Sequence, residues 1–559
     1  YPFMKNYLRI VLFLLLTSNI SNAQVVFQHV DYSQVYDYLD EMANMKVIEL
    51  NSAVKPYTRI FIAEKLSEIG NKKETLNKRQ QEEWKFYMRE YSKELDASSQ
   101  TDFLTKKMFG ADRTKFRDRE KRVDLFYFRD STFMFTLNPI LGAQFWTNDS
   151  GNVYHRWNGA EMMFYAGRHL GVYANLRDNY MSKAITSPNF LTQQTGGGFK
   201  NPTYGFSNRD AVEYSEMRGG ITFNGKWGYI GLIKDHNVWG NNYNGANILS
   251  SRAPSFAQIR LQVKPSRWLE LNYFHGWLSS KVIDTAATQF YGTGTTTAYV
   301  PKYMAANFIT VKPVKNLHFS IGNSIIYSQD FNAGFLIPFI FYKSLDHTYS
   351  TLGNSQLFVD LSVRNLKHCH FYVTGFFDDI SFGRLFEENA LNPWSVKAGT
   401  RISNIIKNVS LTAEYTRNNV LAYKHFNPET TFETTKYNMG HYLRDNAQDI
   451  FLMVSFKPVA RLSVDLIYNY SNKGPDYPDD RNAVDPVTGQ DIIFTYPFQE
   501  KLIWEKTAYA IQAQYDILND FTLRAKVEMA DVKDENGVYT HPLFQGDQMT
   551  TSLMLTVGF

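Results

Sequence analysis

Apolar and polar side chains alternate with a period of two along most of the chain beyond residue 132. Segment 257–273 shows this on both sides of a Pro265-Ser266-Arg267 turn, with apolar residues at every second position: Ala257, Ile259, Leu261, Val263, Leu269, Leu271 and Tyr273. Successive side chains of a β-strand point to opposite faces, so each segment has one apolar and one polar face. The pattern predicts amphipathic strands, which occur in soluble sandwiches and in membrane barrels.

Eighteen such segments are predicted from the alternation and the turn residues that bound them. They lie near 133–146, 154–167, 170–180, 212–225, 227–240, 255–266, 268–280, 302–314, 317–329, 354–366, 369–380, 395–406, 409–419, 448–459, 461–472, 506–518, 521–532 and 549–559. Short turns alternate with longer connections, the short ones being at 167–169, 225–226, 265–267, 315–316, 365–368, 407–408, 459–460 and 519–520. This alternation is typical of outer-membrane barrels, whose short turns are periplasmic.

We therefore expect residues 133–559 to form an all-β transmembrane barrel of about 18 antiparallel strands. An even number of strands places both ends of the barrel on the periplasmic side. The last strand has apolar residues on one face and ends in Phe559, which resembles the assembly signal of outer-membrane proteins. The predicted location is the outer membrane, with the N-terminal region and the C-terminus in the periplasm.

The first 132 residues follow other patterns. Residues 1–23 resemble a secretory signal peptide, with a basic start, a short apolar core and a Ser21-Asn22-Ala23 cleavage site; residues 1–3 precede the expected start at Met4. Residues 24–100 carry three runs of apolar residues at helical spacing, which predicts a small periplasmic α-helical bundle. Residues 101–132 are rich in charges of both signs and are predicted to be a linker.

Composition narrows the class of protein. Hydrophobic residues make up 44% of the 559 residues and aromatic residues 16%, as expected of a barrel in which alternate residues face lipid and aromatic girdles mark the interfaces. A soluble, aromatic-rich carbohydrate-binding β protein is the alternative, and the regular alternation of turns argues against it. A net charge of +4 does not suggest nucleic-acid binding. The single cysteine, Cys369, excludes an internal disulfide framework.

Catalytic and metal-binding motifs are missing from the sequence. Asp235 and His236 are adjacent on a predicted strand, so their side chains should point to opposite faces and should not form a dyad. The loop 473–503 carries five aspartates without calcium-loop spacing, and we expect it to be solvated. We therefore predict no enzyme activity, no cofactor and no metal site.

Charged residues of both signs fall on the polar faces of the strands. We expect a hydrogen-bonded polar network in the lumen that includes Arg260, Lys264, Glu270, Arg524, Lys526 and Glu528. An open selective pore favours one sign of charge, so this mixture predicts a mostly closed interior.

Two groups of residues form family-like motifs. The first lies in the helical region and comprises Tyr38-Leu39, Ala43, Pro56, Arg59, Ile62-Ala63 and Leu66. The second is central and comprises Val238-Trp239-Gly240, Gly245, Leu249-Ser250, Ala253-Pro254 and Ile259-Arg260-Leu261. Together they resemble the Wzi-type capsule assembly family of outer-membrane proteins. Within the family, the segment Asn138-Pro139-Ile140 resembles the RemB branch of gliding motility proteins.

The resemblance implies a lectin-like barrel that holds capsular or surface polysaccharide, with outer-membrane lipid and lipopolysaccharide as its surroundings. The alternative is a structural subunit of a motility apparatus, in contact with motility or secretion machinery; a passive porin or an enzyme is less favoured. The loop that starts at Trp239 is the predicted glycan site, because aromatic rings cover sugar faces and amides bond to sugar hydroxyls. Its candidate residues are His236, Trp239, Asn241, Tyr243 and Asn244.

Overall fold

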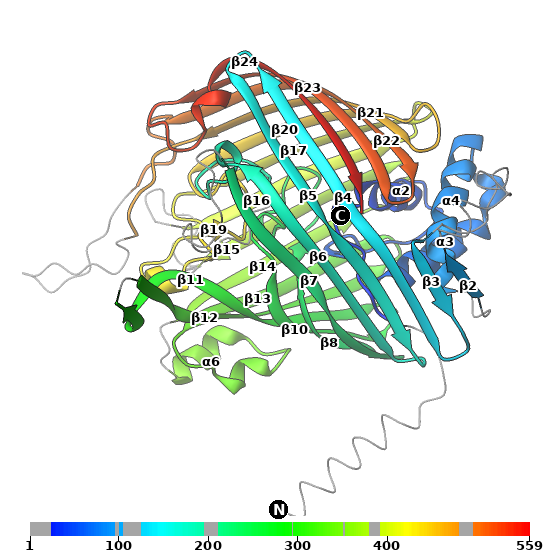
Figure 1. Ribbon diagram of the computed structural model, residues 1–559, viewed down its shortest axis with the longest axis horizontal. Coiled ribbons are helices and arrows are strands. Elements are labelled where there is room, and N and C mark those ends of the chain that lie inside the picture. Colours follow the sequence, from blue (N-terminus) through cyan, green and yellow to red (C-terminus); the bar gives the residue numbers. More distant parts are fainter. Residues whose placement is uncertain are drawn as a thin grey trace, which may run out of the picture.

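The computed structural model describes residues 24–95, 100–103, 124–194, 211–292, 294–349, 353–378, 392–479 and 496–558. Within them, eighteen antiparallel strands close into a barrel, with β24 paired to β4 (Figure 1). These strands are β4 (Phe133–Asn148), β5 (Gly151–Ala166), β6 (Leu170–Ser182), β7 (Ala211–Gly225), β8 (Gly228–Asp235), β10 (Phe256–Ser266), β11 (Leu269–Tyr291), β12 (Gly294–Val314), β13 (Leu317–Ser328), β14 (Asn354–Val363), β15 (Cys369–Asp378), β16 (Trp394–Ser403), β17 (Val409–Asn418), β20 (Ala447–Phe456), β21 (Leu462–Lys473), β22 (Trp504–Leu518), β23 (Phe521–Asp534) and β24 (Gly546–Val557). The predicted barrel and its eighteen strands are confirmed.

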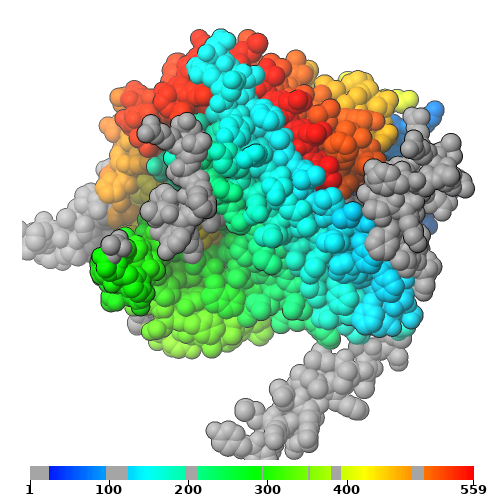
Figure 2. All heavy atoms as spheres, viewed as in Figure 1, coloured from blue at the N-terminus to red at the C-terminus, as the bar shows by residue number. Residues whose placement is uncertain are grey.

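The alternation in the sequence becomes an apolar outer wall. Large apolar side chains at every second position of the strands stay exposed on the outside, among them Leu232, Ile321, Val373, Leu411, Leu466, Ile511, Leu553 and Leu555. Their neighbours point inward and include many buried polar groups, as a wall between lipid and a polar interior requires. On the face seen in Figure 2, the atoms of neighbouring strands form a continuous surface. Among the described residues, no helix is long and apolar enough to cross a membrane.

The strand β4 extends beyond the part that pairs with β24. β24 pairs with Leu141–Thr147, and the preceding part of β4 pairs with β3 (Phe126–Arg129), which in turn pairs with β2 (Gln100–Phe103). Two short strands therefore lie within the segment that the sequence predicted to be a linker. Residues 104–123 of that segment lie outside the described residues.

Three helices at the N-terminus form a bundle at the end of the barrel where the strands are joined by short turns (Figure 1). They are α2 (Ser33–Asn44), α3 (Arg59–Gly70) and α4 (Lys78–Tyr91). Thr58 caps α3 through the Phe61 N–H, and Asn77 and Gln80 form a capping box on α4. Apolar residues of the three helices pack into one core, which includes Tyr38, Leu39, Met42, Ile62, Leu66 and Phe86.

The bundle binds the short turns through polar contacts. Asn44 O accepts from the His368 N–H at 2.7 Å, and the Glu49 carboxylate accepts from the Asn316 N–H at 3.0 Å. The Asn519 side chain donates to the carbonyl of Phe86 at 2.8 Å, at the β22–β23 turn. The helices therefore cover the short-turn end of the barrel.

Two long loops fold into the lumen. The loops 236–255 and 419–446 are largely buried and meet inside the barrel, where the Tyr423 hydroxyl donates to Asn247 O at 2.7 Å and the Ser250 N–H donates to Met439 O at 2.7 Å. The first loop also contains β9 (Val238–Trp239), which pairs with β1 (Val54–Lys55) from the helical region. The second contains η7 (Pro428–Thr430), β18 (Glu433–Thr434) and β19 (Tyr437–Asn438).

A further lobe covers part of the outside of the wall. It contains η5 (Ala333–Leu336) and α6 (Tyr342–Tyr349), and lies below β12 and β13 in Figure 1. Its Phe335 and Tyr342 pack on Tyr273, Ala305 and Tyr327 of the neighbouring strands. The remaining short helices are η1 (Lys73–Thr75), η2 (Ser92–Glu94), η4 (Lys183–Ile185) and η8 (Pro542–Phe544).

Candidate functional site

Trp239 lies in the core, although the sequence suggested an exposed loop. The strand β8 ends at Asp235, and the chain then turns into the lumen, leaving Trp239 only 2% exposed. Its ring stacks on Phe308, with centroids 5.4 Å apart and planes 11° apart, and meets Phe274 edge-on at 5.2 Å. A ring enclosed in this way cannot cover the face of a sugar, so this part of the predicted site is corrected.

Asn241 is also used internally. It is 1% exposed, and its backbone and side-chain N–H groups donate to the two carboxylate oxygens of Asp360 at 2.9 and 2.7 Å. Its side-chain oxygen accepts from the hydroxyl of Ser52 at 2.5 Å. The amide therefore joins the loop to β14 and to the helical region, and its polar groups are already bonded to protein.

Tyr243 and Asn244, unlike Trp239 and Asn241, line a cavity inside the barrel. Their backbone N–H groups donate to the two oxygens of Glu414, each at 2.7 Å. The Tyr243 ring lies under the guanidinium of Arg401, 4.6 Å from its centroid. The Tyr243 hydroxyl donates to the Asp40 carboxylate at 3.1 Å.

The cavity has a volume of about 830 Å³, near the upper part of the range of about 300–1,000 Å³ common for ligand pockets. α2 borders it on the side of the short turns, through Ser33, Gln34 and Asp37. Loop residues such as Phe190, Leu191 and His541 border it elsewhere. Its walls are the inward faces of β4–β7 and β20–β24.

Both aromatic and charged side chains line this cavity. The aromatic set includes Trp146, Trp157, Tyr214, Tyr243, Tyr442, Trp504 and Tyr539. The charged groups are largely paired: Arg177 with Glu216 at 2.9 Å, Arg401 with Asp37 at 3.1 Å, and Lys506 with Glu528 at 3.0 Å. Rings beside such donors and acceptors can bind a ligand that has both apolar faces and hydroxyl groups.

The predicted lumen network divides between two places. Arg524, Lys526 and Glu528 line the large cavity. Arg260, Lys264 and Glu270 line a separate cavity of about 250 Å³ near the β10–β11 turn and α3, where Lys264 and Glu270 pair at 3.4 Å. The six residues therefore do not form one continuous group.

Sequence reasoning missed the residues that β4–β7 contribute to the large cavity. Trp146, Trp157, Arg177 and Glu216 lie on the inward faces of predicted strands, so the period of two could have indicated them. The sequence signal that could have identified Trp146 and Trp157 is an aromatic residue on the otherwise polar face of a predicted strand. Most of the predicted acidic loop, residues 480–495, lies outside the described residues.

The closed wall, its apolar outside and its filled polar lumen define a plugged outer-membrane β-barrel. A family model described as capsule assembly protein Wzi matches residues 144–541, which is more than half of the chain. The protein therefore belongs to the Wzi capsule assembly family, and the resemblance seen in the sequence is confirmed.

Among solved structures, one with a TM-score above 0.5 shares the fold, and others are more distantly similar. One is Wzi of Escherichia coli, described as a carbohydrate-binding β-barrel of the outer membrane involved in group 1 capsule assembly; it is 12% identical, covers 96% of this chain and 100% of its own, and has a TM-score of 0.54. OccAB2 of Acinetobacter baumannii is 10% identical over 76% of this chain and 97% of its own, with a TM-score of 0.41. OccK8 (OprE) of Pseudomonas aeruginosa is 9% identical over the same shares, also with a TM-score of 0.41. No curated protein matches the chain.

Proposed function

We propose that this barrel binds capsular or surface polysaccharide at the outer membrane, in the manner of a lectin, and that the large lumen cavity is the binding site. The observation that carries the proposal is the lining of that cavity by Trp146, Trp157 and Tyr243 beside paired charged groups. The family membership and the carbohydrate binding of E. coli Wzi support it. Both favour a binding role over catalysis.

The orientation follows from the loops. We place the helical bundle and the C-terminus in the periplasm, because the bundle covers the short turns and short turns are periplasmic in such barrels. The long connections then face the cell exterior, and polysaccharide reaches the cavity from that side. The exposed apolar wall contacts lipid and the acyl chains of lipopolysaccharide.

The test removes one ring and one charge from the cavity. Trp146→Ala combined with Arg524→Gln should weaken binding of purified surface polysaccharide at least about tenfold, since a stacked ring and a hydrogen bond each contribute about 1 kcal/mol. Polysaccharide held on cells should fall in parallel. Trp268→Ala is the matched control, because Trp268 is 55% exposed and lies outside this cavity.

Heat-modified gel mobility must show that each variant assembles as a barrel. An assembled double variant that binds polysaccharide as tightly as the parent would exclude the cavity as the site. A parent protein that binds no surface polysaccharide would instead favour the structural role in motility.

A further inference from the structure

Three potential metal ligands from distant parts of the chain meet inside the barrel. His29 belongs to the segment that precedes α2, Asp235 is the last residue of β8, and His236 follows it. One donor atom from each lies within 4.8 Å of the others. The two imidazole rings meet edge-on, with centroids 5.7 Å apart. The sequence predicted that Asp235 and His236 would point to opposite faces; that is wrong, because the strand ends at Asp235.

The two histidines have donor atoms that the protein does not use. His236 is 3% exposed and the His29 side chain 9%. Among the described residues, both ring nitrogens of His236 and Nε2 of His29 have no hydrogen-bond partner. Buried polar atoms nearly always have a partner, so three such nitrogens in one place point to a ligand.

The groups around the histidines suit a cation. The Asp235 carboxylate is held by the Tyr173 hydroxyl, which donates to Oδ2 at 2.8 Å, and by the His236 N–H, which donates to Oδ1 at 2.8 Å. Asp31 Oδ2 lies 3.4 Å from Nδ1 of His29. The backbone N–H of Asp31 also points to this nitrogen, at 3.3 Å, so both groups lie on the Nδ1 side of the ring and leave Nε2 for the ion. With the ion bound, the Nδ1 proton points to the Asp31 carboxylate, as is common in ligating histidines.

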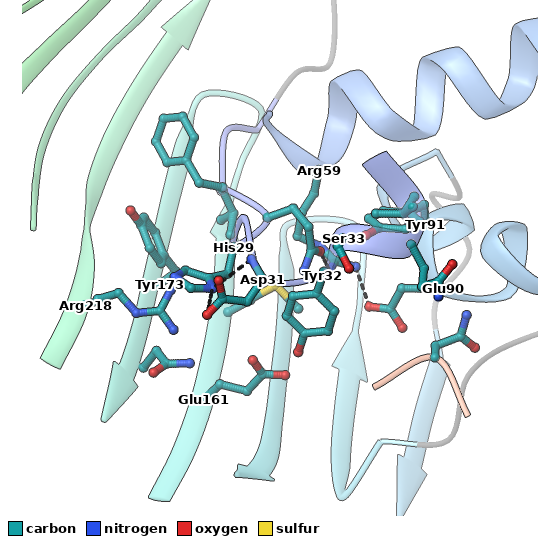
Figure 3. Close-up of a pocket in the computed structure, with 18 of the residues that line it drawn as sticks. His29, Asp31, Tyr32, Ser33, Arg59, Glu90, Tyr91, Glu161, Tyr173 and Arg218 are labelled. Carbon is teal, nitrogen blue, oxygen red and sulfur yellow. Dashed lines mark hydrogen bonds and ion pairs between the residues drawn. The ribbon is translucent and has the colours of Figure 1, made fainter. Parts of the chain in front are cut away.

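His29 and Asp31 line a cavity of about 70 Å³ (Figure 3). Asp235 lines it as well, and the cavity leaves room for water to complete a coordination shell. Arg59 and Glu90 of this cavity pair with each other at 2.6 Å. The other charged groups that line it are four carboxylates and one cation: Asp31, Glu161, Asp235, Asp516 and Arg218. Arg218 interacts with Asp235 and opposes a bound cation, but the acidic groups outnumber it.

We propose that His29, Asp235 and His236 bind a divalent transition-metal ion of the zinc class. Two imidazole nitrogens and one carboxylate oxygen are a common donor set for zinc, with water as the fourth ligand. Small side-chain rotations bring the three donors to about 2.0–2.2 Å from the ion. The ion links the segment before α2 to the point where the chain leaves the barrel wall. It therefore stabilises the packing of the N-terminal helical region against the lumen loop 236–255.

The test uses the full-length mature protein, purified without a histidine tag and stripped with a chelator. After dialysis against Zn²⁺, mass spectrometry of the metal content should find about one zinc per chain, and Co²⁺ should give the visible absorption of a four-coordinate site. His29→Gln combined with His236→Gln should lose at least nine-tenths of the zinc and this absorption. His347→Gln is the control, because His347 is an exposed histidine on α6.

Zinc should also raise the melting temperature of the parent but not of the double variant. Parent protein that retains no more zinc than a tenth of an equivalent overturns the proposal, and so does an assembled double variant that retains the parent amount. If the double variant fails to assemble, the zinc content and the cobalt spectrum of the parent decide the question alone.

Discussion

At the scale of single residues, the interior of this barrel is held by buried side chains that serve several partners at once. Arg364 follows β14 and is 2% exposed. Its guanidinium donates to Asp40 at 2.8 Å, to Ser52 at 2.8 Å and to Asn44 at 3.0 Å, all in the helical region. Asn241 plays a similar part in the loop 236–255. Such residues position the helical region and the loop 236–255 inside the barrel. Replacing any one of them removes several hydrogen bonds at once.

Trp239 gives the clearest prediction at this scale. Trp239→Ala should lower the free energy of unfolding by about 3–5 kcal/mol, because it leaves a cavity between Phe308, Phe274 and the loop backbone. The measurement is the midpoint of urea unfolding in detergent, with Trp268→Ala, at an exposed position, expected to stay within about 0.5 kcal/mol of the parent. Parent-like stability of Trp239→Ala would contradict the core position of the ring. A loss of polysaccharide in this variant would report disturbed packing and not a lost sugar contact.

At the scale of elements, ion pairs join the helical bundle to the turns. Arg79 of α4 pairs with Glu41 of α2 and with Glu83, and Lys457 at the β20–β21 turn lies 3.0 Å from Glu83 and 3.8 Å from Glu41. The four side chains are nearly buried. Losing one member of such a group leaves the others desolvated without a counter-charge, which is costly.

Acid should therefore release the bundle. Burial disfavours ionisation of Glu41, but the charges of Arg79 and Lys457 outweigh it and hold its pKa well below the ordinary value of 4.5. A carboxylate with a lowered folded pKa contributes stability that is complete above 4.5 and is lost as the pH falls below it. Protease cleavage within residues 24–95 should thus increase as the pH falls below about 4.5.

The matching variant is Glu41→Gln. It should destabilise docking by about 1.5–3 kcal/mol at neutral pH, since it replaces charged hydrogen bonds, and should flatten the dependence on pH. Glu68→Gln is the control, because the Glu68 side chain is 38% exposed and its pairs with Lys65 of α3 and with Lys72, which follows α3, are open to solvent. An unchanged pH dependence in Glu41→Gln would assign the acid response to other groups.

At the scale of the whole molecule, the lumen is closed by more than one segment. The helical bundle covers the short-turn end, and the loops 236–255 and 419–446 fill the interior. The large cavity is bordered by α2 on the bundle side. This arrangement suits a barrel that retains a ligand better than one that conducts solutes.

Planar-bilayer recordings should accordingly show little conductance from the intact protein. Deleting residues 31–95 should raise the conductance, because α2 no longer blocks the cavity, yet the value should stay below that of an empty eighteen-stranded barrel, since the two loops remain inside. Large and stable open channels from the intact protein would contradict the plugged arrangement. Heat-modified mobility of the deleted form is the control for assembly.

The sequence by itself determined the wall of the barrel and the helical bundle. Period-two alternation is a local property imposed on every strand by lipid on one side and a polar lumen on the other, so all eighteen strands could be predicted from it. The segments that resemble the Wzi family were sufficient to predict the family as well. The same period-two alternation also predicted that side chains such as Arg524 and Lys526 face the lumen.

The tertiary structure alone decided where the connections go. The alternation of faces holds only within a strand, so the sequence placed Asp235 and His236 on opposite faces. In the structure β8 ends at Asp235, and His236 already belongs to the loop 236–255. Whether a long loop faces solvent or folds inward depends on partners far away in the chain, as Trp239 depends on Phe308 and Asn241 on Asp360. The meeting of His29 with His236 is of the same kind, because no local pattern relates a segment before the first helix to the end of a strand in the barrel wall.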